Sequence, residues 1–197
     1  MPKLYFVSSN DEKYREIRDT LVESGIEIER ITLDLPEIQS LNPAEVAAYK
    51  ARKAFEYLGN GVTPGETVSF SEAVLVEDTG LAVNAWNDFP GALIKWVLGS
   101  IGEAGLCRQL DAWTDRSVTA TVVLCLFDGH DLRTFTGQTS GHIAPEPRGT
   151  FGFGWDSIFQ PDGYALTYGE MQREDKMKIS MRGRALAALK DYLRSIA

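Results

Sequence analysis

Short apolar runs alternate with helix-periodic segments through the first half of the chain, and no other feature constrains the fold as strongly. Residues 4–7 form an apolar run typical of a buried strand, and residues 14–22 repeat apolar side chains at helical spacing. A second strand is predicted over 26–35, a helix begins at Asn42-Pro43, and a third strand covers 73–76. Strands that alternate with helices predict an α/β fold.

The second half of the chain adds a hairpin to this pattern. Residues 117–127 are rich in Val and Thr, which favour strands. The turn signal Asp128-Gly129-His130-Asp131 follows directly and leads into a further strand over 132–138. A hairpin added to alternating strands and helices predicts a mixed sheet rather than a pure Rossmann order, and we treat residues 1–197 as a single domain.

Helices are predicted on both sides of the hairpin. Residues 90–98 and 103–113 precede it, and a last helix begins near Ser180. The side chains that this last helix directs inward are Leu186, Leu189 and Leu193.

The charge balance narrows the class of ligand. Lys and Arg total 20 and Asp and Glu total 28, so the formal net charge is −8. A general nucleic-acid binder needs an excess of Lys and Arg to neutralise phosphates, so we expect no nucleic-acid partner. A small anionic ligand in a local basic pocket remains compatible with the composition.

Other features of the sequence argue against further classes of protein and of site. No apolar run reaches the ~18 residues of a membrane span, and the polar stretch 10–18 is unlike a signal peptide, so we expect a cytoplasmic protein without a membrane partner. The chain has two cysteines and two histidines, which makes a Cys/His zinc site or a Ser-His-Asp triad difficult to assemble.

The first motif with chemical content is Ser8-Ser9-Asn10-x-x-Lys13. A strand that ends in small polar residues and turns into a helix presents free backbone N–H groups to an anion, and Lys13 in the first helical turn can reach a phosphate there. Ser9 with Glu12 fits a capping box. Taken alone, the segment fits a capped surface helix with a solvated lysine equally well.

The second motif is Glu77-Asp78-Thr79-Gly80, at the predicted end of the apolar strand. Neighbouring strand residues point to opposite faces, so we expect one of the two carboxylates to face a given cleft. An Asp beside Gly suits a hard cation that takes oxygen ligands. Alone, the motif also fits a turn after a strand, and Glu37 in a Pro-containing turn is a third isolated acid.

Two motifs near the C-terminus complete the set. In Gly152-Phe153-Gly154-Trp155-Asp156 the glycines let backbone approach a flat ligand, on which an aromatic ring can stack. Residues 173–184 are the densest basic stretch and could face phosphates or the carbonyl oxygens of a base. An aromatic cluster under a loop and a solvated charge run are the alternative interpretations.

Together these motifs form the parts of a nucleoside triphosphate site, and their order along nearly the whole chain resembles the inosine triphosphate pyrophosphatase family. That family hydrolyses ITP, dITP and XTP to the monophosphate and pyrophosphate. The signatures that carry the resemblance are Ser8-Ser9-Asn10-x-x-Lys13, Asp34-Leu35-Pro36-Glu37, Val76 to Leu81, Pro90-Gly91, Lys95-Trp96, Pro147-Arg148-Gly149, Phe153 to Asp156, Phe159 to Tyr164, Glu170-Met171, Lys176, Ser180 and Arg182.

The resemblance implies an elongated mixed sheet flanked by helices, with two lobes and the active-site cleft between them, and a homodimer. It implies Mg²⁺ held by Glu37 and Asp78, with Asp78 also orienting or deprotonating the attacking water. The substrate-binding residues that it implies are Ser8, Ser9, Asn10, Lys13, Lys50, Thr79, Phe153, Gly154, Trp155, Asp156, Lys176, Met181 and Arg182.

Within that set the resemblance separates a phosphate end from a base end. The residues implied to hold the triphosphate are Ser8, Asn10, Lys13 and Lys50, whereas Phe153 would stack on the purine. The residues implied to frame the edge of the purine are Trp155, Asp156, Lys176 and Arg182. The implied reaction is in-line attack of water on the α-phosphorus, without a covalent intermediate.

One position departs from the family pattern. The family reads Ser-His-Arg where this chain has Ser180-Met181-Arg182, and Met cannot donate the hydrogen bond with which the His recognises the 6-oxo group. We therefore expect hydrolysis of deaminated purine nucleoside triphosphates to be retained. The alternatives are the same chemistry with an altered base specificity, a nucleotide-binding module without turnover, and a Maf-like pyrophosphatase. The segment from Gly61 to Ser71 is extra length without an assigned purpose.

Overall fold

A computed structural model of the chain describes residues 4–59 and 72–196. The segment from Gly61 to Ser71, to which no purpose is assigned from the sequence, lies outside these residues. Within the described ranges no helix is long and apolar enough to cross a membrane.

Strands and helices follow one another along the chain as the apolar periodicity predicts. The strands are β1 (Leu4–Val7), β2 (Ile28–Ile31), β3 (Ala73–Val83), β4 (Pro90–Gly91), β5 (Ser117–Phe127), β6 (Leu132–Ile143) and β7 (Phe159–Pro161). The α-helices are α1 (Asp11–Val22), α2 (Pro43–Gly59), α3 (Ile94–Gln109), α4 (Arg173–Ile179) and α5 (Met181–Ser195), and the 3-10 helices are η1 (Asn84–Trp86) and η2 (Tyr168–Glu170).

The described strands form one mixed sheet in the order β2-β1-β3-β5-β6-β7, with β4 paired to β3. β1 pairs in parallel with β2 and β3, while β5, β6 and β7 continue the sheet in antiparallel fashion. The predicted mixed α/β sheet and its hairpin are confirmed.

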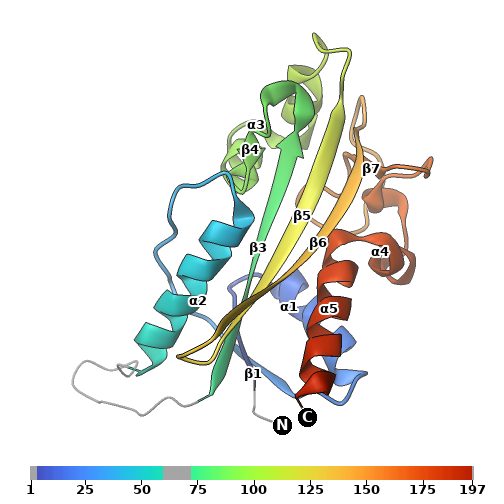
Figure 1. Ribbon diagram of the computed structural model, residues 1–197. Helices are drawn as coiled ribbons and strands as arrows, with labels where there is room; N and C mark the ends of the chain where they lie inside the picture. Colours follow the sequence, from blue (N-terminus) through green and yellow to red (C-terminus); the bar gives the residue numbers. More distant parts are fainter. Residues whose placement is uncertain (1–3, 60–71, 197) are drawn as a thin grey trace.

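Helices cover both faces of this sheet (Figure 1). On one face, α1 and α5 bury Ile17 and Leu186 against a core that contains Phe6 of β1. On the other face, the small side chains of α2 let it approach the sheet, where Ala51 packs with Val7. The side chains predicted to point inward from the last helix, Leu186, Leu189 and Leu193, are all buried.

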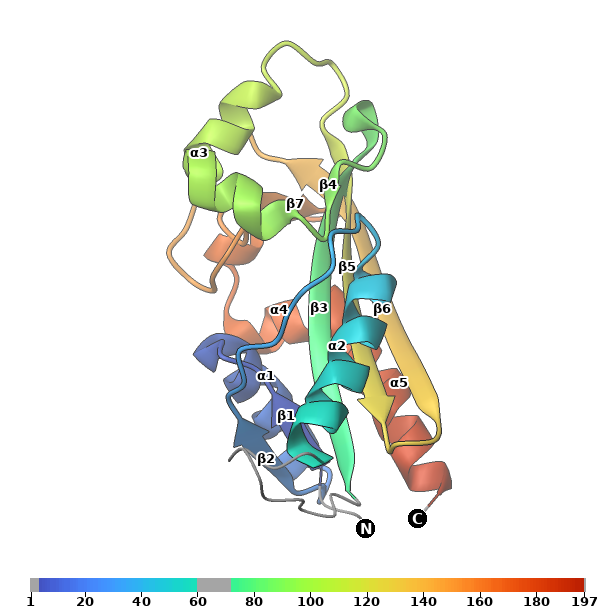
Figure 2. The same cartoon turned by 90° about the vertical axis from the view of Figure 1, so that its left-hand side faces the viewer.

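The three long strands β3, β5 and β6 run the length of the molecule and separate two groups of elements (Figure 2). At one end lie β1, β2, α1 and α2, and at the other end lies α3 with the short strands β4 and β7. Within α3 the backbone at Gly102 is non-helical, with φ 68° and ψ 177°, which agrees with the predicted break between two helices. This division confirms the elongated, two-lobed sheet.

Three local predictions are wrong in detail. The second strand covers only Ile28–Ile31, because residues 32–40 leave the sheet as an extended connection. Asn10, not Ser9, caps α1, since its side chain accepts from the amide of Lys13. Residues 77–80 lie in the middle of β3, not at its end, because β3 continues to Val83 in its pairing with β5.

Candidate active site

A cleft of about 790 Å³ lies between the two groups of elements. The turn before α1, the segment after β2, the middle of β3, the start of α3, the loop 153–156 and the start of α5 all contribute to it. Every predicted site residue except Lys176 lines this cleft: Ser8, Ser9, Asn10, Lys13, Glu37, Lys50, Asp78, Thr79, Phe153, Gly154, Trp155, Asp156, Met181 and Arg182.

The turn between β1 and α1 forms the floor at one end of the cleft. Ser8 Oγ accepts from the amide of Asn10 at 3.1 Å, and Asn10 Oδ1 accepts from the amide of Lys13 at 3.0 Å. The amides of Ser9, Asp11 and Glu12 donate to no acceptor within residues 4–59 and 72–196. Free amides at a helix N-terminus favour an anion, so this end of the cleft suits a phosphate.

Lys13 connects this turn to the middle of β3. Its Nζ donates to Thr79 Oγ1 at 3.1 Å and lies 3.2 Å from Glu77 Oε1, and Thr79 Oγ1 donates to the same Glu77 oxygen at 3.0 Å. Glu77 and Thr79 are two residues apart in a strand, so both side chains point to one face of the sheet. These contacts hold the Lys13 ammonium at the edge of the cleft.

Asp78 points to the opposite face, as strand alternation predicts. Lys50 of α2 lies 3.5 Å from Asp78 Oδ1 and 3.0 Å from Glu37 Oε1, so one ammonium joins both acids. Burial raises the pKa of Asp78 to about 6, although Lys50 and Lys13 act to lower it. For Glu37 burial also acts to raise the pKa, but the neighbouring lysines outweigh it and hold the pKa below its usual value.

The donor set around Asp78 fits a magnesium ion. Asp78 Oδ2 is buried and has no hydrogen-bond partner among residues 4–59 and 72–196, and the Glu37 carboxylate contacts the same lysine as Asp78. In the described part of the chain, no group of three or more His, Cys, Asp or Glu side chains is placed to hold a metal ion by itself. Mg²⁺ is commonly held by one or two carboxylates plus substrate phosphates and water, so two acids are sufficient.

Arg182, at the start of α5, is held by two buried acids. Its Nε and Nη2 donate to Glu77 Oε2 and Oε1 at 2.8 and 2.9 Å, which is a bidentate pair, and its Nη1 donates to Glu16 of α1. Burial alone would raise the pKa of Glu77, but Arg182 and Lys13 outweigh it and hold that pKa far below its usual value. All three guanidinium nitrogens therefore donate to acids of the protein, and Arg182 also lines the cleft.

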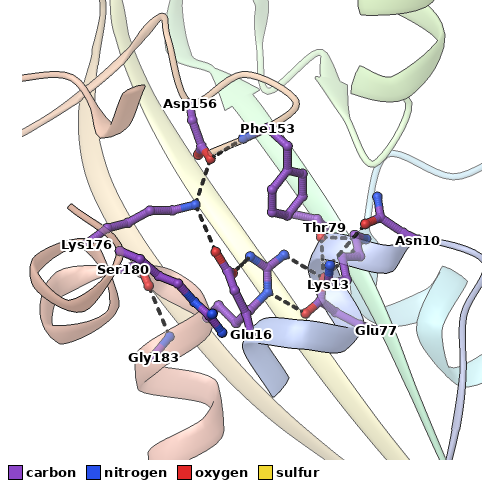
Figure 3. Close-up of polar contacts among 12 residues, drawn as sticks. Asn10, Lys13, Glu16, Glu77, Thr79, Phe153, Asp156, Lys176, Ser180 and Gly183 are labelled. Carbon is purple, nitrogen blue, oxygen red and sulfur yellow. Dashed lines mark hydrogen bonds and ion pairs between the residues drawn. The ribbon is translucent and has the colours of Figure 1, made fainter. Parts of the chain in front are cut away.

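Lys176 is a buried side chain that contacts Asp156 and Glu16 (Figure 3). Its Nζ donates to Asp156 Oδ2 at 2.7 Å and lies 3.4 Å from Glu16 Oε1, while Asp156 Oδ2 also accepts from the amide of Phe153 at 2.8 Å. Lys176 is 3% exposed and does not line the cleft. It therefore meets the predicted base site through Asp156, which positions the Phe153 backbone.

The Phe153 ring lies against the same cations at the wall of the cleft. Lys176 Nζ lies 5.1 Å and Arg182 Cζ 5.3 Å from the ring centroid. Gly152, with φ +76°, makes this loop possible, since a Cβ there would lie 2.1 Å from Asp156 Oδ2. The loop therefore presents an aromatic face that is backed by positive charge.

Met181 lines the cleft beside Arg182 and is 2% exposed. Its backbone lies directly on β6, where a Cβ on Gly137 would be 1.9 Å from Met181 O. Ser180 caps the helix, because its Oγ accepts from the amide of Gly183 at 3.1 Å. The contact of the Met181 backbone with β6 thus holds this residue in the lining of the cleft.

Some residues of the site carry no role in the sequence-based prediction, among them Glu77, which pairs with Lys13 and Arg182. Lys95 and Trp96 line the cleft from the start of α3, and their place among the signatures of the resemblance was the available signal. Glu16 binds both Arg182 and Lys176 from α1. Its signal was a charged residue next to Ile17 on the apolar stripe of that helix, where an acid needs a buried partner.

Comparisons with known proteins agree with this geometry. The model of the Ham1 family matches residues 4–192. The chain is 39% identical over 195 residues to the dITP/XTP pyrophosphatase of Methanopyrus kandleri, which covers 98% of this chain and 97% of that protein. It is 40% identical over 197 residues to the inosine triphosphate pyrophosphatase of Kluyveromyces lactis, which covers 98% and 96%.

Solved structures give the same result. A HAM1 protein from Coxiella burnetii superposes with a TM-score of 0.80 at 27% identity and covers 99% of this chain and 100% of its own. A nucleoside-triphosphatase, or dITP/XTP pyrophosphatase, from Mycobacterium abscessus superposes with a TM-score of 0.68 at 31% identity and covers 95% and 97%. The fold, the motifs and the full-length match agree, and the chain belongs to the Ham1 family.

Proposed function

We propose that the protein hydrolyses deaminated purine nucleoside triphosphates (ITP, dITP and XTP) to the monophosphate and pyrophosphate. The observation that carries this proposal is Asp78, a buried carboxylate with one oxygen that no described residue partners, in a cleft that it shares with Lys13 and Lys50. The names of the relatives from Methanopyrus kandleri and Kluyveromyces lactis support the substrate class.

In this proposal the triphosphate lies along the floor of the cleft. The free amides at the start of α1 and the ammonium groups of Lys13 and Lys50 neutralise phosphate oxygens, and the Phe153 ring stacks on the purine. The base and the phosphates then occupy opposite ends of one cleft, which places the α-phosphorus between them. This placement supports cleavage next to the α-phosphate.

The chemical step is the attack of water on the α-phosphorus. The new bond joins the water oxygen to phosphorus, the bond from phosphorus to the β-bridging oxygen breaks, and pyrophosphate leaves. Asp78 accepts the proton of the water and releases it to solvent, which suits a carboxylate whose pKa burial raises to about 6. Mg²⁺, when bound by Glu37 and Asp78, supplies positive charge that offsets the charge on the phosphate oxygens.

A substrate panel tests the activity. Pyrophosphate release is measured from ITP, dITP, XTP, GTP and ATP, each with Mg²⁺ and with a chelator in its place. We expect release from the deaminated purines in the presence of Mg²⁺ and none after chelation. The proposal fails if no nucleotide releases pyrophosphate, or if the products are a diphosphate and phosphate.

A single substitution tests the role of Asp78. Asp78→Asn removes the proton acceptor and one metal ligand, so turnover falls by at least about 100-fold while the protein stays folded. Asp191→Asn, in an exposed pair with Arg194 on α5, is the matched control and keeps full turnover. Full activity of Asp78→Asn would show that another group does this chemistry.

Met181 supports a second, finer proposal about base choice. A buried thioether that lines the cleft offers no hydrogen bond to the 6-oxo group of the base. A hydrogen bond of this kind is worth about 1–3 kcal/mol, or roughly 5- to 150-fold in selectivity. Met181→His raises the preference for ITP over ATP if Met181 relaxes base choice, and an unchanged ratio of kcat/KM values argues against it.

We also propose that the protein acts as a homodimer in the cytoplasm, an expectation that follows from the family resemblance. Light scattering of the purified protein tests the dimer, because a monomer mass across the working concentration range contradicts it. Cell fractionation tests the location.

A further inference from the structure

Arg30, on β2, contacts the turn that precedes α1 from outside the cleft. Its Nε donates to Ser8 O at 2.8 Å, and its Nη1 pairs with the carboxylate of Asp11. Its guanidinium also lies over the Tyr14 ring, with Cζ 5.5 Å from the ring centroid. One side chain of the neighbouring strand therefore holds the residue that follows β1 and the first turn of α1 together, yet it does not line the cleft.

The Ser8 peptide is held from both of its ends. The Ser8 N–H donates to Ile31 O at 3.1 Å, and the Ser8 carbonyl accepts from Arg30. In a trans peptide, a carbonyl and the following N–H point in opposite directions. The bond that ties Ser8 O to Arg30 therefore turns the N–H of Ser9 away from Arg30, and Ser9 itself lines the cleft.

We propose that Arg30 is a positioning residue for the triphosphate of the substrate. It acts through the Ser8 carbonyl and Asp11, which keep the free amides of Ser9, Asp11 and Glu12 in the arrangement that receives phosphate oxygens. This inference rests on the proposed function, because it assigns a role in binding the same substrate. It predicts an effect on phosphate affinity and none on the chemical step at Asp78.

Arg30→Met tests the inference, because Met keeps an unbranched apolar stem and removes every donor. We expect the KM for ITP to rise about tenfold and kcat to stay within about twofold of the wild type. The inhibition constant of inorganic tripolyphosphate, measured with Mg²⁺ in excess, rises by the same factor, whereas that of inosine does not change. Arg30→Lys restores one donor and the charge, and it gives an intermediate KM.

Arg15→Met is the matched control, since Arg15 is an exposed arginine of α1 that pairs with Glu12 through its side chain. It leaves KM and kcat unchanged. Unchanged KM and tripolyphosphate inhibition in Arg30→Met overturn the inference. A loss of kcat together with a lower Tm, at constant KM, also overturns it, because Arg30 is then only structural.

The failure of the proposed function has a different signature. If the wild-type protein releases pyrophosphate from no nucleotide, the function is wrong, and calorimetric binding of tripolyphosphate to the wild type and to Arg30→Met still tests the role of Arg30. A tenfold weaker binding by Arg30→Met supports the role, and equal binding rejects it.

Discussion

Arg182 lies at the centre of a buried ion-pair network in which the acids Glu16, Glu77 and Asp156 balance the cations Lys13, Lys176 and Arg182. The desolvation cost of burying these charges is offset by their mutual attraction only while every member of the network keeps its partners. At the residue scale, the same side chains therefore hold the fold together and shape the wall of the cleft.

Removing the central cation leaves two buried acids with fewer partners. Arg182→Met lowers the free energy of unfolding by about 3–5 kcal/mol, the cost of an uncompensated buried charge. Urea denaturation measures this loss. Arg15→Met breaks only an exposed pair and changes stability by about 0.5 kcal/mol or less. A loss below about 1 kcal/mol in Arg182→Met would show that the acids find other partners or protons.

Asp78 makes the stability of the metal-free protein depend on pH. Its pKa is about 6 in the folded protein, against 3.8 for an Asp side chain that is free in water. Between these values the folded state keeps a proton that the unfolded state has lost, so this contribution falls as the pH rises through the window. The carboxylate therefore destabilises the fold at pH 7, by up to about 3 kcal/mol.

Asp78→Asn removes this titration and is the measurement that checks it. In a chelator, urea denaturation at pH 7 gives a more stable Asn variant, and at about pH 4 the difference between the two proteins disappears. A difference that is constant with pH would contradict the raised pKa. Such a cost in stability is common for groups retained for catalysis.

At the element scale, β3 supplies the centre of the site because it does not stop where its polar residues begin. Each residue from Val74 to Val83 pairs with β5, so the pairing with this one neighbour holds Glu77, Asp78 and Thr79 in the strand. On the other side of β3, β1 pairs only as far as Leu75 and β4 pairs from Leu81. Alternation sends Glu77 and Thr79 to the α1 and α5 face and Asp78 to the α2 face. One strand thus contributes to the ion-pair network and to the proposed magnesium site at once.

The close approach of α5 to β6 positions Met181 and Arg182. Gly137→Ala places a Cβ 1.9 Å from Met181 O, so the start of α5 must move away from the sheet. We expect a loss of about 1–3 kcal/mol in unfolding free energy and a lower kcat/KM for ITP. Thermal denaturation and steady-state kinetics measure the two effects.

Gly99→Ala is the control for that substitution. A Cβ at Gly99 of α3 meets nothing within 4 Å, and Ala stabilises a helix by about 0.8–1.0 kcal/mol relative to Gly. The control therefore raises stability slightly. If Gly137→Ala is as stable and as active as the wild type, the contact between α5 and β6 does not position the site.

At the scale of the whole molecule, the net charge is −8, and the cleft is lined by the cations Lys13, Lys50, Lys95 and Arg182 together with the acids Asp34, Glu37, Glu77, Asp78 and Asp156. A polyanion has to approach over the acidic surface, whereas a small nucleotide needs only the cleft. The overall charge therefore opposes a polyanion, while the cations of the cleft stay within reach of a small anion.

The acidic surface predicts that nucleic acid does not compete with the nucleotide substrate for the cleft. A single-stranded DNA oligonucleotide at about 10⁻⁴ M does not inhibit ITP hydrolysis, although nonspecific DNA-binding proteins bind at that concentration or below. Inorganic tripolyphosphate, with Mg²⁺ in excess, is the positive control and inhibits. Competitive inhibition by the oligonucleotide would contradict the role assigned to the acidic surface.

The sequence by itself determined the alternation of the longer strands and helices, the mixed sheet and most of the residues that line the cleft. It did not predict β4, β7 or α4, and the helix predicted over 90–98 begins only at Ile94, after the strand Pro90–Gly91. Apolar periodicity is a local property, so α2, the β5–β6 hairpin and α5 follow from neighbouring residues.

Two segments were misassigned from the local sequence. Three polar residues in β3 resemble a strand end, but β3 continues because its residues up to Val83 pair with β5. Ser9 and Asn10 are both suitable N-cap residues, and Asn10 caps α1 because its side chain accepts from the amide of Lys13.

Only the tertiary structure decided which charges meet. Glu16 and Arg182 are 166 residues apart, Glu77 and Arg182 are 105 apart, and nothing in the local pattern of any one element couples them. Their pairing arises because α1, α5 and the middle of β3 pack on the same face of the sheet. A buried charge is stable only beside its partner, so the roles of these residues depend on packing that no single segment contains.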